Sequence, residues 1–387
     1  MKILCVGGGS GGHITPIVAV LEQLESPKYQ DELDGQLETR VWCDRKFAPQ
    51  AHKLLGDTRV DVIVAGKLRR YANLKWWYRW FSPYHIIHTH IPNLIDLFKI
   101  AGGFVQSLVK LKLWRPDVVF CKGGYVSLPV GIVAHWYHIP LVIHDSDTVP
   151  GLTNRVLARY ADAIGTGAPV KNYPSYPKNK TKYIGVPVQG NVKHISKTSQ
   201  LELKRELGLT DKPFILAMGG GLGSVAINNA VVANAKNLAA SGAELLLLSG
   251  KGHVVNVPAK ARKSLMVQEF SSQVPDYEQV ADIVITRAGA TTMAELATVG
   301  VATIIIPSPY LSDDHQTKNA MVYAEAEAAI VLNEFELREQ PELLWQAIDE
   351  LLSNSKERQK LAGNLHREFA RPRALDDMID LILSVIK

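Results

Sequence analysis

Short apolar runs alternate along the chain with longer segments in which apolar residues recur every three or four positions. The first run, Ile3 to Val6, leads into a glycine loop. Apolar residues at helical spacing follow at Ile14, Ile17, Val18, Leu21 and Leu24. We place Pro16 in the first turn of that helix. Buried strands that are each followed by an amphipathic helix are typical of a parallel sheet covered by helices, so the pattern predicts an α/β protein.

The second half of the chain repeats this order of elements. A strand is expected over residues 214–218, a glycine loop over 219–224 and a helix over 225–238. Between the halves, proline, lysine, asparagine and tyrosine replace the apolar periodicity, which is typical of a linker. We therefore predict an N-terminal Rossmann-like domain, a linker, a C-terminal Rossmann-like domain and a closing helix that packs back on the N-terminal domain, at residues 1–170, 171–185, 186–370 and 371–387.

The stretch from Asp282 to Gln316 predicts a complete βαβ unit. It reads as a strand over 283–286, a small-residue turn over 287–290, a helix opening at Thr291 or Thr292, and a second strand. The hydroxyls at the helix start are candidates to cap it. A helix N-terminus at the carboxyl end of a strand favours a phosphate, and Glu295, one turn further on, suits ribose or sugar hydroxyls. A βαβ unit with a capped helix and no ligand is the alternative.

The first glycine loop, residues 7–12, also joins a strand to a helix and ends at His13. It lacks the Lys-Ser/Thr pair of a nucleotide-binding P-loop. Asp44 lies about ten residues too late for the acidic residue of a dinucleotide site. Because His13 ends the loop, it is a candidate for acid–base chemistry or for a sugar contact, with a purely structural histidine as the alternative.

Two further expected strands end in polar residues. Residues 117–121 lead into Gly123, Gly124 and Tyr125, and residues 139–143 lead into His144, Asp145, Ser146 and Asp147. Ligands gather outside the carboxyl ends of parallel strands, so we expect these residues to share an edge with the first glycine loop. For Asp145 or Asp147 alone, the alternative is a turn residue that caps the helix near Gly151.

Basic and aromatic residues interleave from Lys67 to Phe81, and an amphipathic helix is expected over residues 97–113. Indole rings beside cations suit the headgroup level of an anionic membrane surface. The alternative is a loop whose aromatic side chains pack on their own domain. Single-stranded nucleic acid has no other support, since the net charge is only +5. His85, His88 and His90 lack partner ligands at useful spacing and indicate a solvated or lipid-facing loop rather than a metal site.

The composition agrees with a two-domain globular protein. The chain has 387 residues, of which 47% are hydrophobic and 21% charged. Cys5, Cys43 and Cys121 lie far apart in or beside apolar runs, which indicates buried thiols in a reducing compartment. Neither a signal peptide nor a transmembrane helix is expected, because the first apolar run is too short and the window 91–114 contains charged residues. We expect a peripheral protein on the cytoplasmic side of the cell membrane.

Seven motifs, in order and spacing, resemble the MurG family of bacterial UDP-N-acetylglucosamine:lipid I N-acetylglucosaminyltransferases. They are GGGSGGH (7–13), GGYVSLP (123–129), PLVIHDSD (140–147), GLTNRVLARYAD (151–162), GVPV (185–188), TRAGATTMAELATVG (286–300) and DDHQTKNA (313–320). The resemblance implies a GT-B fold, in which two Rossmann-like domains with parallel sheets face a cleft. It implies UDP-GlcNAc and the lipid-linked acceptor lipid I as substrates, and no cofactor or active-site metal.

The resemblance also implies roles for individual residues. The donor side would comprise Ser10, Gly11 and Gly12 against the diphosphate and sugar, Ala290, Thr291, Thr292, Met293 and Ala294 under the phosphates, Glu295 at the ribose, Ser271 at the uracil, Gln316 at the sugar hydroxyls, and Asp147, Gln189 and Gly221. The acceptor side would comprise His13, Tyr125 and Asp145.

The sequence departs from the family pattern at the positions of several of these contacts. Gly221-Leu222 replaces Ser-Gln, Gln189 replaces an arginine, Asp145 replaces a glutamate and Asp147 an asparagine. The reaction implied is inverting transfer of N-acetylglucosamine to the 4-hydroxyl of MurNAc, with His13 as the first choice for the base and Asp145 as the second. The alternatives are a related enzyme with another acceptor, such as diacylglycerol, and an inactive relative that binds a nucleotide sugar.

Overall fold

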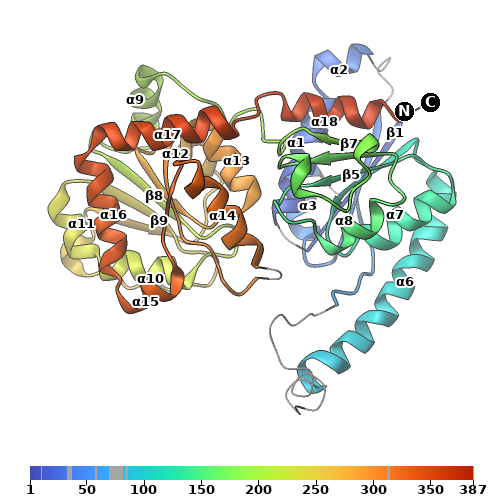
Figure 1. Ribbon diagram of the computed structural model, residues 1–387, viewed down its shortest axis with the longest axis horizontal. Helices are drawn as coiled ribbons and strands as arrows, with labels where there is room; N and C mark the ends of the chain where they lie inside the picture. The colour runs from blue at the N-terminus through green and yellow to red at the C-terminus, as the bar shows by residue number, and fades with distance from the viewer. Residues whose placement is uncertain are drawn as a thin grey trace. The chain divides into compact units, whose positions relative to one another are not determined.

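A computed structural model gives the fold of the chain and describes residues 1–387 except 10, 33–36, 57–58, 69–81, 83–85, 312–313 and 387. The chain forms two compact units (Figure 1). The first comprises Met1–Gln189 together with Arg373–Lys387, and the second comprises Gly190–Pro372. Each unit is a parallel β-sheet covered by helices, so the α/β class predicted from the sequence is confirmed.

The first unit has a seven-stranded sheet in the order β3-β2-β1-β4-β5-β6-β7, and the pairs are parallel. The strands are β1 Lys2–Gly7, β2 Glu38–Cys43, β3 Val60–Val62, β4 Val118–Gly123, β5 Leu141–Asp145, β6 Ala163–Thr166 and β7 Thr181–Tyr183. The central strands are apolar on both sides because helices cover both faces. Thus Ile3 and Cys5 of β1 lie in one core, and Leu4 and Val6 lie in the other.

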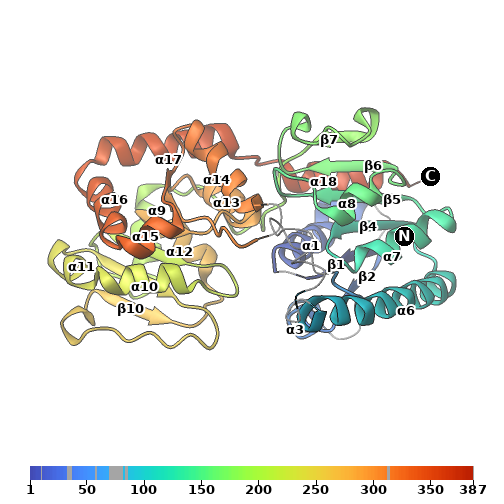
Figure 2. The same ribbon diagram turned by 60° about the horizontal axis from the view of Figure 1, so that its bottom comes forward.

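The helices of the first unit divide between these two faces. They are α1 Gly11–Leu24, α2 Pro27–Glu32, α3 Ala48–Leu55, the π-helix η2 Ile86–His90, α6 Ile91–Trp114, α7 Ser127–Trp136, α8 Leu152–Leu157, η3 Val170–Asn172, η4 Lys178–Lys180 and α18 Ala374–Leu383. The first core contains α1, α3 and α18, and the second contains α6, α7 and α8. The C-terminal helix α18 packs against α1 and β6 (Figure 2).

The second unit has a six-stranded parallel sheet in the order β10-β9-β8-β11-β12-β13. Its strands are β8 Phe214–Met218, β9 Glu244–Leu248, β10 Leu265–Gln268, β11 Ile283–Thr286, β12 Ala302–Ile305 and β13 Ile330–Val331. Its helices are α9 Lys197–Glu206, α10 Val225–Ala233, α11 Ala235–Ser241, η5 Ala259–Ala261, α12 Val274–Val280, α13 Ala290–Val299, α14 His315–Glu325, α15 Glu334–Glu339, α16 Glu342–Ser353 and α17 Ser355–Phe369.

The structure corrects several expected helix boundaries. α1 begins at Gly11, so Pro16 lies beyond its first turn. α13 begins at Ala290 with Gly289 as its N-cap residue, and no side chain caps it. The helix expected over 225–238 is divided at Asn234, whose side-chain amide donates to the carbonyl oxygen of Ala230 at 2.9 Å and to that of Pro341 at 2.7 Å. Because one helix ends and the next begins at Asn234, its side-chain amide can make both hydrogen bonds.

The segment 171–185, expected as a linker, contributes structure to the first unit. β7 pairs with β6, and the side chains of Tyr173 and Tyr176 are buried in the core formed with α6, α7 and α8. The first unit therefore extends to Gln189. The two large tyrosines bury enough apolar area to hold this segment in place, although lysine, proline and asparagine interrupt its apolar pattern.

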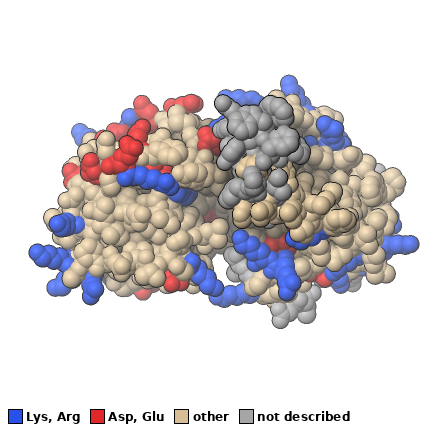
Figure 3. Space-filling view, turned by 90° about the horizontal axis from the view of Figure 1, so that it is seen from below, with Lys and Arg blue, Asp and Glu red and all other residues tan. Residues whose placement is uncertain are grey.

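Three features of the described residues bear on possible ligands. Cys5, Cys43 and Cys121 are buried, unpaired thiols, as expected. Within the described ranges, no cluster of three or more His, Cys, Asp or Glu is placed to hold a metal ion, and no helix has the length and apolar character needed to span a membrane. Lysine and arginine side chains lie scattered over the face seen in Figure 3 rather than in one patch.

Candidate active site

Each sheet reverses its strand order at a point where two glycine-bearing turns meet. In the first unit the reversal lies between β1 and β4, and the turns that follow these strands are residues 7–12 and 123–126. In the second unit it lies between β8 and β11, which are followed by residues 219–224 and 287–289. Open parallel sheets bind ligands at such switch points, outside the carboxyl ends of the strands. Each unit therefore carries its own candidate ligand edge.

In the first unit, backbone contacts hold the two turns against each other. Gly124 has a φ of 81°, and a Cβ there would collide with the carbonyl oxygen of Gly8. Only glycine allows both the positive φ and the close approach. The buried carboxylate of Asp44, at the end of β2, accepts hydrogen bonds from the N–H of Gly9 at 2.8 Å and of Lys46 at 2.9 Å. Asp44 therefore fixes the shape of the first glycine loop.

His13 lies in the first turn of α1 at this edge. Its Nδ1 is 2.6 Å from the carbonyl oxygen of Gly8, so Nδ1 carries the proton and donates it. In the neutral ring, Nε2 is then the atom with the lone pair. Burial, followed by the charge of Lys122, lowers the pKa of His13 from 6.5 to about 4, against smaller raising effects from Gly8, Asp147 and Asp44. His13 is therefore a neutral imidazole at pH 7, with the tautomer needed to accept a proton at Nε2.

Asp145, at the end of β5, is buried and holds its surroundings in place. Its Oδ2 accepts hydrogen bonds from the hydroxyl of Tyr176 at 2.8 Å and from the N–H of Gly151, the N-cap residue of α8, at 2.9 Å. Burial and the charge of Asp147 raise the pKa of Asp145. The geometry resembles the helix-capping alternative raised from the sequence, because Asp145 orders the start of α8 through Gly151.

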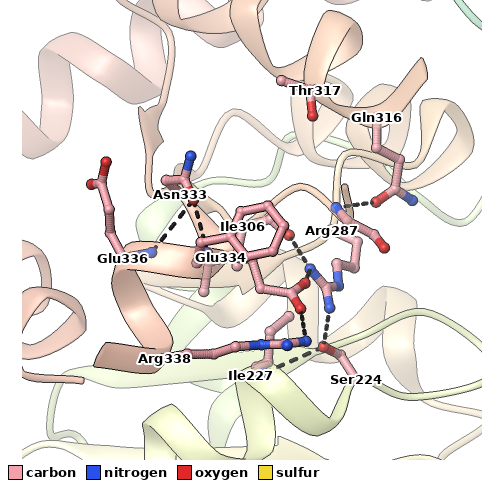
Figure 4. Close-up of polar contacts among 12 residues, drawn as sticks. Ser224, Ile227, Arg287, Ile306, Gln316, Thr317, Asn333, Glu334, Glu336 and Arg338 are labelled. Carbon is pink, nitrogen blue, oxygen red and sulfur yellow. Dashed lines mark hydrogen bonds and ion pairs between the residues drawn. The ribbon is translucent and has the colours of Figure 1, made fainter. Parts of the chain in front are cut away.

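In the second unit, Arg287 connects the two turns at the switch point (Figure 4). Its guanidinium donates to the hydroxyl of Ser224 at 2.7 Å, to the carbonyl oxygen of Ile306 at 2.8 Å and to the carboxylate of Glu334 at 2.6 Å. Ser224 is the N-cap residue of α10 and ends the glycine loop 219–224. Glu334 is buried and also pairs with Arg338. This network fixes the glycine loop relative to the turn that precedes α13.

The N-terminus of α13 supplies backbone donors at this edge. The first hydrogen bond of the helix runs from the N–H of Met293 to the carbonyl oxygen of Gly289, at 2.9 Å. Amides in the turn before that bond face out of the helix end, where the macrodipole is positive. The side chain of Met293 is fully buried in the unit, so it serves packing.

A pair of glutamates lies one turn into α13 and on the neighbouring helix α12. Burial raises the pKa of Glu295 from 4.5 to about 7. Glu278 is 0% exposed, and neither of its carboxyl oxygens has a hydrogen-bond partner among the described residues. Burial and the nearby Glu295 raise the pKa of Glu278 well above 4.5. Burial therefore shifts both carboxyl groups toward their neutral forms, and Glu295 titrates near neutrality.

The structure does not describe all the residues that were proposed from the sequence, and several of the others belong to the first unit. Ser10 lies outside the described residues, and so do residues 69–81 of the basic, aromatic stretch and His85. Gly11 and Gly12 begin α1, Tyr125 packs against Gly9, Asp147 follows β5, and Gln189 donates to Glu22 at 3.4 Å. These residues belong to the first unit.

The remaining residues proposed from the sequence belong to the second unit. Gly221 is exposed in the glycine loop, and Ser271 accepts from the N–H of Gln273 at 3.1 Å beyond the end of β10. Gln316 opens α14 and accepts from the N–H of Ser308 at 2.9 Å (Figure 4). Ala290, Thr291, Thr292, Ala294 and Glu295 all lie in the first six residues of α13.

Lys122, Arg287 and Glu278 received no role from the sequence. Lys122 ends an apolar strand directly before two glycines, and a lone charge in such a run is the signal that marks it. Glu278 lies at a core-facing position of a short helix, which is the corresponding signal for a buried acid. Arg287 had no such signal, because a basic residue in a turn is ordinarily solvated.

Comparison with known proteins agrees with this layout. Residues 3–166 match the glycosyltransferase family 28 N-terminal domain, and residues 214–374 match the family 28 C-terminal domain. Both candidate edges lie mainly within these regions. The two sheets and the two matching domains define a glycosyltransferase.

Full-length relatives narrow the class. The UDP-N-acetylglucosamine--N-acetylmuramyl-(pentapeptide) pyrophosphoryl-undecaprenol N-acetylglucosamine transferase of Pediococcus pentosaceus is 30% identical over 400 aligned residues, covering 100% of both chains. The enzyme of the same name from Halalkalibacterium halodurans is 31% identical and covers 87% of each chain. The crystal structure of Acinetobacter baumannii MurG matches with a TM-score of 0.68 at 25% identity, covering 99% of both chains. The chain belongs to the MurG family of N-acetylglucosaminyltransferases, as the motifs had indicated.

Proposed function

We propose that the protein transfers N-acetylglucosamine from UDP-GlcNAc to the 4-hydroxyl of the MurNAc unit of lipid I, with inversion at C1, and so forms lipid II. The names of its full-length relatives give the donor sugar and the lipid-linked acceptor. The observation that carries the chemistry is the fixed tautomer of His13, which leaves Nε2 to accept a proton at the ligand edge of the first unit.

On the acceptor side, His13 Nε2 removes the proton of the 4-hydroxyl as its oxygen attacks C1 of the donor sugar. Because the pKa of His13 is lowered to about 4, the base is available at every physiological pH. Asp145 has an orienting role, because its hydrogen bonds hold the start of α8 and the side chain of Tyr176 in place. Tyr125, packed against Gly9, completes the acceptor contacts.

On the donor side, the N-terminus of α13 receives the diphosphate. Backbone N–H groups and the helix dipole stabilise the negative charge that grows on the UDP as the bond to C1 breaks. Glu295 accepts hydrogen bonds from the ribose hydroxyls, Ser271 lies by the uracil, and Gln316 contacts the donor sugar. Arg287 holds the turn that carries this helix end, through Ser224 and Glu334. Leaving-group stabilisation then needs no metal ion.

We also propose that the protein works on the cytoplasmic side of the cell membrane as a peripheral protein. α6 buries Asp96, Gly103, Ser107, Leu111 and Trp114 on one side. Its opposite side carries exposed apolar residues at helical spacing, namely Ile91, Leu94, Ile95, Phe98, Val105, Val109 and Leu113. Phe98 is 72% exposed and Leu113 is 81% exposed, which is unusual for a helix in water. The helix extends past the sheet (Figure 1), so this row is suited to lie at a lipid interface.

The test is transfer of radiolabelled GlcNAc from UDP-GlcNAc to lipid I in detergent or vesicles. We expect a labelled lipid product and one UDP released per transfer. Parallel reactions with diacylglycerol as acceptor, and with UDP-glucose as donor, should give little product. Transfer to diacylglycerol instead would replace the proposed acceptor, and UDP binding without release of UDP would indicate an inactive relative.

A further inference from the structure

A single peptide group connects a buried carboxylate to the proposed base. The carboxylate is that of Asp44, which follows β2 and is 5% exposed. Its Oδ2 accepts the N–H of Gly9 at 2.8 Å. The carbonyl oxygen of Gly8 accepts the proton of His13 Nδ1 at 2.6 Å. Because the N–H of Gly9 and the carbonyl of Gly8 belong to the same peptide group, Asp44 and His13 bind its two ends.

The geometry of the peptide group allows it to link these two side chains. The group is planar and trans, so its N–H and its C=O point in opposite directions and can bind two partners without competition. Hydrogen bonds in such a chain polarise one another, and a bond to a charged acceptor is stronger than a bond between neutral groups. The carboxylate of Asp44 therefore makes the Gly8 oxygen a stronger acceptor for His13 than an isolated carbonyl would be.

The approach of the carboxylate to this peptide group requires glycine. A Cβ at Gly8 would lie 2.5 Å from Oδ2 of Asp44 and 2.9 Å from a side-chain carbon of Val126. Gly9 has a φ of 87°, which glycine adopts without strain. The other carboxylate oxygen, Oδ1, accepts the N–H of Lys46 at 2.9 Å. Backbone groups on two segments thus fix the carboxylate at the position from which it binds the peptide.

We infer that Asp44 is a positioning residue of the transfer reaction, which acts through the peptide group of Gly8 and Gly9 to hold the His13 ring and to stabilise the positive charge that the ring acquires. The inference rests on the proposed role of His13 as the base. As the 4-hydroxyl oxygen bonds to C1 and the bond from C1 to UDP breaks with its electron pair on the UDP oxygen, the hydroxyl proton moves to Nε2. The resulting imidazolium donates more strongly through Nδ1 to the polarised Gly8 oxygen. In catalytic triads the carboxylate binds Nδ1 directly, whereas here a peptide group lies between the two.

The first test observes His13 without substrate. Histidines of the full-length protein are labelled with ¹⁵N, and the His13 signals are those that disappear in His13→Gln. We expect the wild-type ring to carry its proton on Nδ1, with that proton far downfield. In Asp44→Asn, which keeps one oxygen but loses the charge, the Nδ1 proton should move upfield because the Gly8 oxygen is less polarised. A wild-type ring protonated on Nε2, or an Nδ1 proton that Asp44→Asn leaves unmoved, would overturn the inference.

The second test is a double-mutant cycle on sugar transfer. Asp44→Asn should lower kcat by about 10-fold and change the Kd for UDP by less than about twofold, because the proposed UDP site lies in the second unit. In a His13→Gln background, Asp44→Asn should change kcat by less than about twofold, because an effect that acts through His13 is lost with the ring. If the effects of the two substitutions on kcat multiply, Asp44 does not act through His13 and the inference fails.

A matched control is Asp117→Asn. The carboxylate of Asp117 accepts the N–H of Lys2 at 2.7 Å, at the opposite end of β1 from the glycine loop. The control therefore also removes a carboxylate that binds a backbone N–H, but it should change neither the Nδ1 proton of His13 nor kcat. An Nδ1 proton that moves in Asp44→Asn, in a protein that transfers no sugar, would support the link between Asp44 and His13 and reject the proposed function.

Discussion

At the scale of single residues, the protein uses buried titratable groups in two different ways. His13 and Lys122 lie in the first unit, and burial lowers the pKa of each. Glu278 and Glu295 lie together in the second unit, where burial favours the neutral forms. Burial therefore favours a neutral imidazole at His13, whereas in the second pair the negative charge falls on the more accessible Glu295.

Replacing His13 tests its role as the base. His13→Gln keeps a donor for the carbonyl oxygen of Gly8 but has no titratable nitrogen. We expect kcat to fall by about 10²- to 10⁴-fold, while the Kd for UDP changes less than about twofold, because α13 is intact. The measurement is steady-state transfer together with calorimetric UDP binding, and His135→Gln, at an exposed histidine of α7, is the control. A near-normal rate in His13→Gln would remove this residue from the mechanism.

The carboxyl of Glu278 has no hydrogen-bond partner among the described residues, which predicts that its removal stabilises the protein. Its pKa in the folded protein is raised above the ordinary 4.5, so its contribution to stability is fully present below pH 4.5 and is lost as the pH rises toward the raised value. We expect Glu278→Met to raise the free energy of unfolding at pH 7 by about 1 to 3 kcal/mol. The gain should shrink as the pH approaches 4.5. Urea unfolding at both pH values measures this difference.

A matched control for Glu278 is Glu202, an exposed glutamate of α9 in the same unit. Glu202→Met should leave the unfolding midpoint nearly unchanged at both pH values, since surface substitutions rarely exceed about 0.5 kcal/mol. If Glu278→Met destabilised the protein at pH 7, the carboxyl would have a partner in solution that the described residues do not provide.

At the scale of secondary-structure elements, two helices have faces or ends that the rest of their unit leaves available. α13 presents its N-terminus at the switch point, where Gly289 caps it without a side chain. α6 buries one side and exposes an apolar row on the other. A helix N-terminus favours negative charge and an exposed apolar row favours a lipid interface, so both features are suited to contacts with something outside the unit.

The donor helix predicts a pH dependence of UDP binding. Glu295 has its pKa raised to about 7, and its ionised form accepts stronger hydrogen bonds from ribose hydroxyls than its neutral form. UDP affinity should therefore rise by about threefold or more between pH 6 and pH 8, and Glu295→Gln should flatten this dependence. Calorimetry of both proteins separates the glutamate from the titration of the UDP phosphate itself. Equal slopes in the two proteins would exclude Glu295 from the ribose site.

The apolar row of α6 predicts binding to anionic vesicles. Phe98→Glu combined with Val105→Glu should weaken vesicle binding by about tenfold or more, because two exposed apolar side chains would lose their burial in the lipid interface. Leu201→Glu combined with Val254→Glu adds the same two charges at exposed apolar residues of the second unit and should have little effect. Flotation with phosphatidylglycerol vesicles measures binding, and soluble UDP binding should be unchanged in all variants.

At the scale of the whole molecule, most of the sheet architecture could be predicted from the sequence. Helices cover both faces of each sheet, so its central strands are apolar on both sides. A short, continuous apolar run such as 214–218 or 283–286 is therefore typical of such a strand. Helix starts were less predictable. Gly11 begins a helix despite weak helix propensity, and Ala290 begins one without a capping side chain, because each follows directly on a glycine turn at a switch point.

The chemistry of the candidate site was predictable only in part. His13 and Glu295 each follow a glycine turn between a strand and a helix. From that position, acid–base chemistry or a sugar contact could be predicted for His13, and a contact with ribose or sugar hydroxyls for Glu295. The tautomer of His13 is fixed by the carbonyl oxygen of Gly8, and Asp145 accepts hydrogen bonds from Gly151 and Tyr176. These contacts depend on the conformations of the loops, which the sequence pattern does not reveal. Tyr173 and Tyr176 entered the core from a segment whose prolines suggested a linker, because aromatic burial outweighed local composition.

The first unit is completed by the last helix of the chain. α18 fills the core beside α1 with Met378, Ile379, Leu381 and Ile382. All other helices and strands of the first unit are synthesised before the second unit, whereas α18 is synthesised after it. The core beside α1 therefore keeps an uncovered face until α18 has been made, although the rest of its unit is complete some two hundred residues earlier in the chain, by about Gln189.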